Sequence, residues 1–176
     1  MKKILLTIAL ILLIPALSYG ADGSCTQSAY DFSSRNVQHP TRVIILACTG
    51  STVDGSLPDT ALNSTMMKLI EGTHYFYSIT AYPTSGGTPP DAADVFILDE
   101  DGVDLLGSTD GGVTANKGAN LIHATLPKRA FAYVDGMGAF YTPPVTTGLT
   151  VRVSNQATAS ANYTLKLVFQ EKAKGK

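Results

Sequence analysis

Apolar and polar side chains alternate one by one along the C-terminal part of the chain. In LTVRVSN, residues 149–155, every second side chain up to Val153 is Leu or Val, and in NYTLKLVFQ, residues 162–170, every second one is Tyr, Leu or Phe. A period of two is that of a β-strand with one buried and one exposed face. Because only the small-residue stretch QATASA separates the two segments, the sequence predicts that they form a C-terminal β-hairpin.

Other segments of the chain also have the composition of strands. Residues 42–50 are apolar on both faces, as expected for a central strand, and residues 73–83 are rich in aromatic and β-branched side chains. Gly and Pro clusters separate these from candidate strands at 93–98, 103–106, 120–126 and 131–134. Only ALNSTMMKL favours a short helical turn. The spacing predicts an all-β, single-domain β-sandwich, Ig-like or jelly-roll-like, with a partly open barrel as the alternative.

The chain begins like a secretory signal peptide. Two lysines precede an apolar run that ends at Leu17, and small residues follow it at Ser18 and Gly20. The run is too short for a membrane-spanning helix, so no transmembrane anchor is expected after cleavage. We expect a signal peptide over residues 1–20, one domain over 21–176, and export to the periplasm, the cell surface or the medium. The expected ends of that domain are an N-terminal strand or arm over 25–37 and a flexible tail over 171–176.

The exported part contains two cysteines, Cys25 and Cys48. In an oxidising compartment two cysteines without other candidates most often form a disulfide, which here closes a loop of 24 residues. On the chain-entropy estimate such a bridge contributes about 3 kcal/mol. The alternative, a reactive cysteine nucleophile, lacks any neighbouring motif.

The charge balance argues against a nucleic-acid partner. Two of the 13 Lys and Arg residues lie in the predicted signal peptide, which leaves 11 against 14 Asp and Glu and a formal charge of −3. This balance predicts no basic surface suited to a phosphate backbone.

The stretch ADVFILDEDGVDLLG, residues 93–107, carries five acidic side chains around one glycine turn. The DEDG sequence that begins at Asp99 has the composition of a short hairpin connection, in which glycine supplies the positive φ. A calcium loop requires carboxylates at alternate positions and a later bidentate Glu, which this stretch lacks. We therefore predict a turn, and the alternative is a calcium site with Asp99, Asp101 and Asp104 as candidate ligands.

Aromatic side chains cluster in FAYVDGMGAFYTPP, residues 131–144. Exposed rings on a loop can stack on sugars or contact a partner, which makes Tyr133, Phe140 and Tyr141 candidate ligand-binding residues. The alternative interpretation is that these rings belong to the core beside a glycine-rich turn.

The sequence contains no recognised signature of catalysis. His39, His74 and His123 lack the spacing of zinc ligands, and no GxSxG, P-loop or GxGxxG sequence occurs. The sequence therefore predicts a protein that is not an enzyme and has no cofactor. A hydrolase would require His74 or His123 to converge with Asp110 or Asp135.

The order of these segments resembles a family of small bacterial and prophage proteins. Its members carry an arginine-led apolar strand, a Pro-Thr linker, a YDI-like strand, a DEDGVD-like turn and a closing hairpin, and the similarity covers residues 42–170. The resemblance implies a β-sandwich structural component of virions or surface assemblies, without an established chemistry. The chain departs from the family in Ala93-Asp94-Val95, where tyrosine usually precedes the aspartate, and in its signal peptide, which favours export over virion assembly.

These features together predict an exported, non-enzymatic structural or binding protein that acts through protein–protein contacts, as a subunit of a surface or virion-like assembly. In such an assembly residues 25–37 would pair with an exposed sheet edge of a neighbour. The alternative function is a carbohydrate- or calcium-binding module of the periplasm or cell surface.

Overall fold

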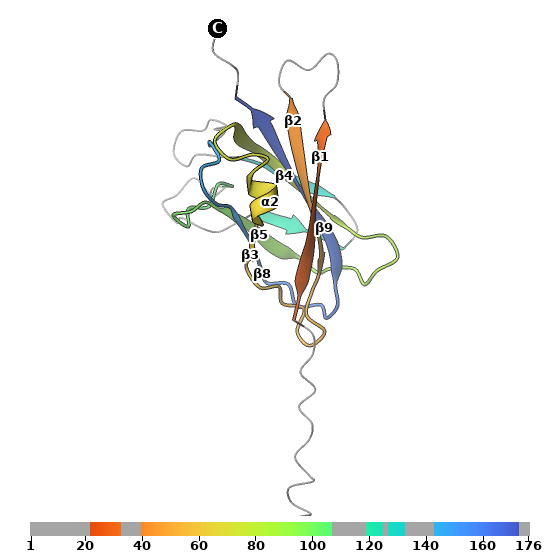
Figure 1. Cartoon of the computed structure of the whole chain (residues 1–176). Coiled ribbons are helices and arrows are strands. Elements are labelled where there is room, and N and C mark those ends of the chain that lie inside the picture. Colours follow the sequence, from red (N-terminus) through yellow and green to blue (C-terminus); the bar gives the residue numbers. More distant parts are fainter. Residues whose placement is uncertain (1–21, 33–39, 107–118, 125–126, 133–142, 173–176) are drawn as a thin grey trace, which may run out of the picture.

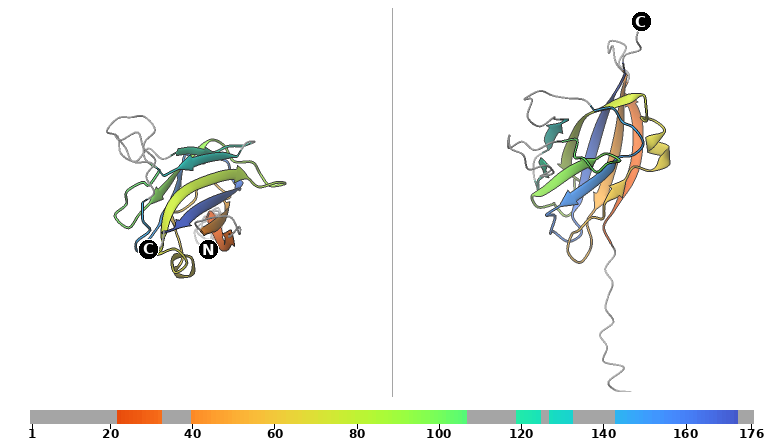
Figure 2. Two further views of the ribbon diagram at one scale, coloured as in Figure 1. Left: turned by 90° about the horizontal axis from the view of Figure 1, so that it is seen from above. Right: turned by 90° about the vertical axis from the view of Figure 1, so that its left-hand side faces the viewer.

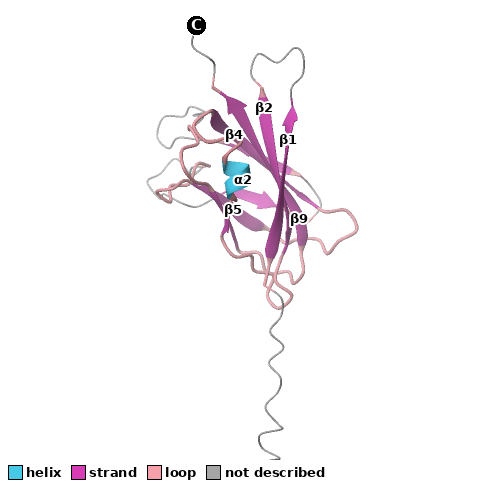
Figure 3. Ribbon diagram, in the orientation of Figure 1, coloured by secondary structure: helices cyan, strands magenta, loops and turns pink. Residues whose placement is uncertain are grey.

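The computed structural model describes residues 22–32, 40–106, 119–124, 127–132 and 143–172. In this part of the chain nearly all regular structure is β-strand, as Figure 3 shows. The strands form two antiparallel sheets that face each other (Figures 1 and 2). The predicted all-β sandwich is therefore confirmed. The predicted signal peptide lies outside the described residues.

The larger sheet, sheet A, has five strands in the order β1-β2-β9-β4-β7. Three of them are long and central, and β1 and β7 form the two edges. Their bounds are β1 Ser24–Phe32, β2 Thr41–Thr49, β9 Asn162–Glu171, β4 His74–Pro83 and β7 Lys128–Phe131.

The smaller sheet, sheet B, has four strands in the order β3-β8-β5-β6. Their bounds are β3 Thr60–Ala61, β8 Thr150–Ser154, β5 Ala93–Leu98 and β6 Ala119–Ile122. A single turn of helix, α2 (Ser64–Met67), follows β3 where a helical turn was predicted. The side chain of Asn63 accepts a hydrogen bond from the N–H of Met66 and so caps its first turn.

The core lies between the two sheets and follows the alternation of the sequence. The four inward side chains of β9 have no exposed surface. Val151 and Val153 of β8, and Leu149 just before it, are buried as predicted. Phe76 of β4 packs edge-to-face on Phe169 of β9, with 5.7 Å between ring centroids. Burial of this apolar area, at about 25 cal/mol per Å², is the main source of stability.

The predicted C-terminal hairpin is wrong. Strand β8 lies in sheet B between β3 and β5, whereas β9 lies in sheet A between β2 and β4. Residues 155–161 thus cross from one sheet to the other, with positive φ at Asn155 and Ser160 and a buried Gln156. Alternation determines which face of a strand is buried but not which strand is its neighbour, and this connection is long enough to cross the sandwich.

Several strand boundaries also differ from the prediction. The strand predicted at 103–106 is not formed: this segment makes one isolated bridge, between Asp104 and Leu98. The Asp104 side chain is buried. Strand β6 ends at Ile122, and β7 starts at Lys128, earlier than the expected 131. Glu171 belongs to β9, and the N–H of Lys172 donates to the carbonyl of Thr73, so the predicted tail does not start at 171. Its last four residues lie outside the described part.

Candidate functional site

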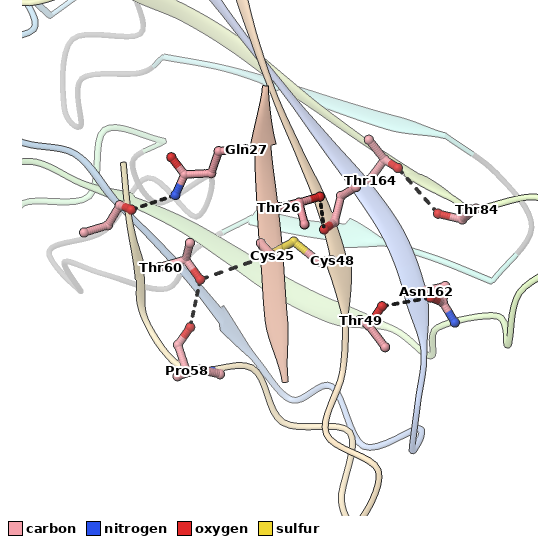
Figure 4. Close-up of a disulfide and its surroundings, with 12 residues drawn as sticks. Cys25, Thr26, Gln27, Cys48, Thr49, Pro58, Thr60, Thr84, Asn162 and Thr164 are labelled. Carbon is pink, nitrogen blue, oxygen red and sulfur yellow. Dashed lines mark hydrogen bonds between the residues drawn. A yellow bond between two sulfur atoms is a disulfide. The ribbon is translucent and has the colours of Figure 1, made fainter. Parts of the chain in front are cut away.

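Cys25 and Cys48 form the predicted disulfide, which joins edge strand β1 to β2 (Figure 4). The two cysteines lie directly opposite each other in the antiparallel register, with their Cα atoms 4.0 Å apart. Cys48 belongs to the core. The bridge therefore attaches the edge strand to the centre of sheet A.

The hydrogen-bond pattern of β2 decides which way the backbone of β1 points. The N–H of Glu171 donates to the carbonyl of Pro40, and the N–H of Gly50 donates to that of Ala161, so even-numbered residues along β2 bond to β9. Odd-numbered residues of β2 then bond to β1, since antiparallel strands alternate their bonding partners. It follows that the peptide groups of Ala29 and Asp31 point away from β2, toward the outside of the sheet.

The first half of the β1 edge is tied to sheet B. The side-chain amide of Gln27 donates to the carbonyl of Ala61 at 2.8 Å, and its oxygen accepts from the N–H of Asn63 at 3.0 Å. Thr60 lies next to the disulfide, with its hydroxyl 3.9 Å from the sulfur of Cys25 (Figure 4). Within the described residues, no backbone–backbone hydrogen bond reaches the outer edge of β1. The side-chain links to residues 60–63 end at Gln27, so we call Ser28–Phe32 the open half of this edge.

The four sheet edges differ in how well they are protected against pairing with another chain. Strand β3 has two residues, β6 has four and pairs with a register shift, and β7 has four and carries Lys128 and Arg129. Short strands, irregular pairing and cationic side chains all discourage strand addition. Strand β1 has nine residues, pairs with β2 in a continuous register, and contains neither Lys nor Pro. Its only charged side chain, Asp31, forms an ion pair with Arg42 of β2.

The acidic stretch forms the predicted turn. One carboxylate oxygen of Asp99 accepts hydrogen bonds from the N–H groups of Asp101 and Val103, at 3.0 and 2.8 Å. Gly102 has φ 79°, and the N–H of Asp99 donates to the carbonyl of Val103, which closes the turn. A hydrogen bond from the Thr146 hydroxyl lowers the pKa of the Glu100 carboxyl.

Asp104, the third candidate calcium ligand, is buried rather than on the turn surface. Its Oδ1 accepts from the N–H groups of Ile97 and Leu106, at 3.0 and 3.1 Å, and so satisfies two backbone donors. Within the described residues, no three His, Cys, Asp or Glu side chains are grouped as a metal ion would require. Calcium binding stays a prediction. One carboxylate oxygen of Asp99 and one of Asp104 already accept hydrogen bonds from backbone N–H groups in and beside the turn.

A polar cavity of about 200 Å³ opens at one end of sheet A. Its lining residues come from β1, β2, β4, β9 and Pro40 before β2: Asp31, Pro40, Thr41, Arg42, His74 and Glu171. This group has no signature in the sequence, because only the strand register brings its members together. The cavity holds both signs of charge, and Asp31 already pairs with Arg42.

His74 is the buried side chain of this cavity. Its Nδ1 lies 2.8 Å from the hydroxyl oxygen of Thr73, and the ring is 7% exposed. Burial first, and then the positive charge of Arg42, lowers the pKa of His74, while Glu171 and Asp31 act in the opposite direction. His74 therefore shares this cavity with Asp31 and Glu171. Asp110 and Asp135, the predicted partners in a hydrolase, lie outside the described residues.

The remaining predicted site residues, Tyr133, Phe140 and Tyr141, also lie outside the described residues. Ligand binding by them stays a prediction.

Comparison with known proteins adds no relative: the chain matches no protein-family model, no curated protein and no solved structure. The resemblance to bacterial and prophage proteins therefore stays a prediction. Among the described residues, no helix has both the length and the apolar character needed to cross a bilayer.

Proposed function

We propose that the chain is an exported, non-enzymatic structural protein that associates with copies of itself through the open half of edge strand β1. The observation that carries this proposal is the outward-pointing backbone of Ala29 and Asp31. These residues lie on the longest edge strand of the sandwich, which has no Lys, Pro or register shift. Unpaired N–H and C=O groups on such an edge are a template for a further strand. The disulfide supports the exported location, since such bridges persist in oxidising compartments.

The simplest arrangement is an antiparallel pair of β1 strands related by a two-fold axis at Tyr30. Ala29 then lies opposite Asp31 of the second copy, and Asp31 opposite Ala29, which keeps the two carboxylates from facing each other. An axis at Ser28 would instead place Cys25 and Gln27 at the contact, where the Gln27 side chain is hydrogen-bonded to the backbone of Ala61 and Asn63. Two-fold pairing of one patch with itself is the commonest form of self-association.

The expected association is weak. Two bonded residue pairs provide four backbone hydrogen bonds, each with a net contribution of about 0.5–1.5 kcal/mol. Their sum of about 2–6 kcal/mol corresponds to a dissociation constant between tens of millimolar and, at the tightest, tens of micromolar. Dimers should therefore appear as the concentration rises from micromolar to millimolar in sedimentation-velocity experiments.

The Ala29→Pro variant tests the role of the edge. Proline removes the outward N–H and leaves the N–H groups that bond to β2 in place, so we expect a folded protein that stays monomeric at every concentration. The matched control, Ala29→Val, keeps the N–H and should dimerise like the parent protein. A parent that is monomeric throughout, or an Ala29→Pro variant that dimerises equally well, would contradict self-association through this edge.

A further inference from the structure

The outer face of sheet A, which points away from the core, carries a group of aromatic rings. Strand register separates this face from the inner one, because residues next to each other along a strand point to opposite sides. Across the five strands, one row of outward residues runs Tyr30, Val43, Val168, Ser78 and Phe131. Four inter-strand spacings of about 4.8 Å make the face about 19 Å wide.

Two rings of this face are exposed, whereas Val43 and Ser78 of the row are buried. Tyr30 on β1 and Tyr77 on β4 are 42% and 36% exposed. Tyr77 is the extra residue at the irregularity between Phe76 and Ser78, and its ring packs edge-to-face on Phe131 with 5.5 Å between centroids. Tyr75 and Tyr82 of β4 also point outward and are partly exposed.

Cationic side chains accompany these rings. The ammonium group of Lys166 lies 5.9 Å from the centre of the Tyr30 ring, and that of Lys172 lies 5.3 Å from the centre of the Tyr75 ring. Arg129 of β7 also belongs to this face, where its Nε donates to the Thr80 hydroxyl at 2.9 Å.

The same face has no described carboxylate among its outward strand positions. The acidic residues of these strands, Asp31 and Glu171, belong to the inward series and line the polar cavity together with His74. The outer face is therefore positive, because Lys166, Lys172 and Arg129 are not balanced by carboxylates among the described residues there. The whole chain, by contrast, has a formal charge of −1.

We propose that the outer face of sheet A binds an acidic polysaccharide, a glycan chain whose sugar rings carry carboxylates. Tyr30 on β1 and Tyr77 on β4 lie three strand spacings apart, about 14 Å, so two separate pyranose rings of one chain can stack on them. Carboxylates of the same chain can pair with Lys166 and Arg129. Threonine hydroxyls such as Thr80 and Thr164 can hydrogen-bond to sugar hydroxyls. This inference goes beyond the self-association through β1 and does not depend on it, since it uses side chains of the face rather than backbone groups of the edge.

Charge and compartment favour a glycan over a single-stranded nucleic acid, which also combines rings with phosphates. Nucleic-acid surfaces usually belong to domains with a pI above about 9, whereas the pI of this chain is about 6.3. The disulfide is typical of secreted, periplasmic and cell-surface proteins.

The test is affinity electrophoresis of the protein recovered from the periplasm after expression of the full chain. Gels contain polygalacturonate, neutral dextran or poly(dT) at equal mass concentration. We expect retardation by polygalacturonate only, and less retardation as salt rises, because mobile ions screen exposed charges. The double variant Lys166→Gln, Arg129→Gln should bind about tenfold more weakly, which corresponds to about 1.4 kcal/mol. Tyr77→Ala should weaken binding in the same direction.

Matched controls separate a specific face from general charge. The double variant Lys68→Gln, Arg152→Gln removes the same charge from the C-cap of α2 and from β8 and should bind like the parent. The Ala29→Pro variant should do the same. Thermal unfolding confirms that each variant is folded. The proposal is overturned by a parent that polygalacturonate does not retard, by control variants that weaken binding equally, or by tighter binding to poly(dT).

Discussion

His74 is a buried, ionisable side chain whose environment favours its neutral form. Burial is the main cause that lowers its pKa below the ordinary value of 6.5. Burial keeps water from stabilising the charge of a protonated His74, and the positive charge of Arg42 repels it, so protonation is easier in the unfolded chain than in the folded one.

This environment predicts how stability depends on pH. Because the pKa of His74 is lower in the folded state, its contribution to stability is fully present above pH 6.5 and falls as pH drops below that value. Urea unfolding at pH 7.5 and 5.5 should show a loss of stability at the lower pH. In the His74→Gln variant that loss should be smaller. An equal loss in both proteins would show that other groups account for the pH dependence.

At the residue scale, the sequence predicted inward and outward positions better than it predicted polar interactions. The inward positions of β8 and β9 follow from alternation alone, since burial depends on the local period of apolar residues. The buried position of Asp104 could not be predicted in this way, because it depends on two backbone N–H groups that the fold brings to it. The cavity around His74 was missed for a similar reason, as its residues come from four strands.

At the scale of elements, strands were easier to predict than their partners. Composition predicted β2, β4 and β5 almost to the residue, and β2 is central as its two apolar faces indicated. The two-residue strand β3 carries no detectable period, and β8 and β9 belong to different sheets although they follow each other in the chain. Only packing between distant segments selects these partners.

The disulfide between Cys25 and Cys48 should stabilise the folded protein at edge strand β1. Strand β1 bonds to sheet A only through β2, and the bridge prevents its separation from that strand. The double variant Cys25→Ala, Cys48→Ala should lose about 3 kcal/mol of unfolding free energy, the value for a loop of this length. Urea denaturation measures that loss, and circular dichroism should still show a β protein. A loss below about 0.5 kcal/mol would show that the bridge does not constrain the unfolded chain.

At the scale of the whole molecule, the two proposed surfaces belong to the same sheet and use different groups. The open half of β1 offers backbone hydrogen bonds, and the outer face of sheet A offers rings and cations. Sheet B contributes the opposite half of the core, and the Gln27 side chain links β1 to the segment that follows β3, through the N–H of Asn63. A copy added at β1 would extend sheet A and place two outer faces side by side.

Residue-resolved amide hydrogen exchange, recorded by NMR in dilute and in concentrated solution, tests the central claim about β1 most directly. In dilute solution the N–H groups of Ser28 and Tyr30, which bond to β2, should be protected, and those of Ala29 and Asp31 should exchange fast. In concentrated solution Ala29 and Asp31 should become protected while the others stay as they were. Protection of Ala29 and Asp31 in dilute solution, or fast exchange of both at every concentration, would contradict an open edge that pairs with a second copy.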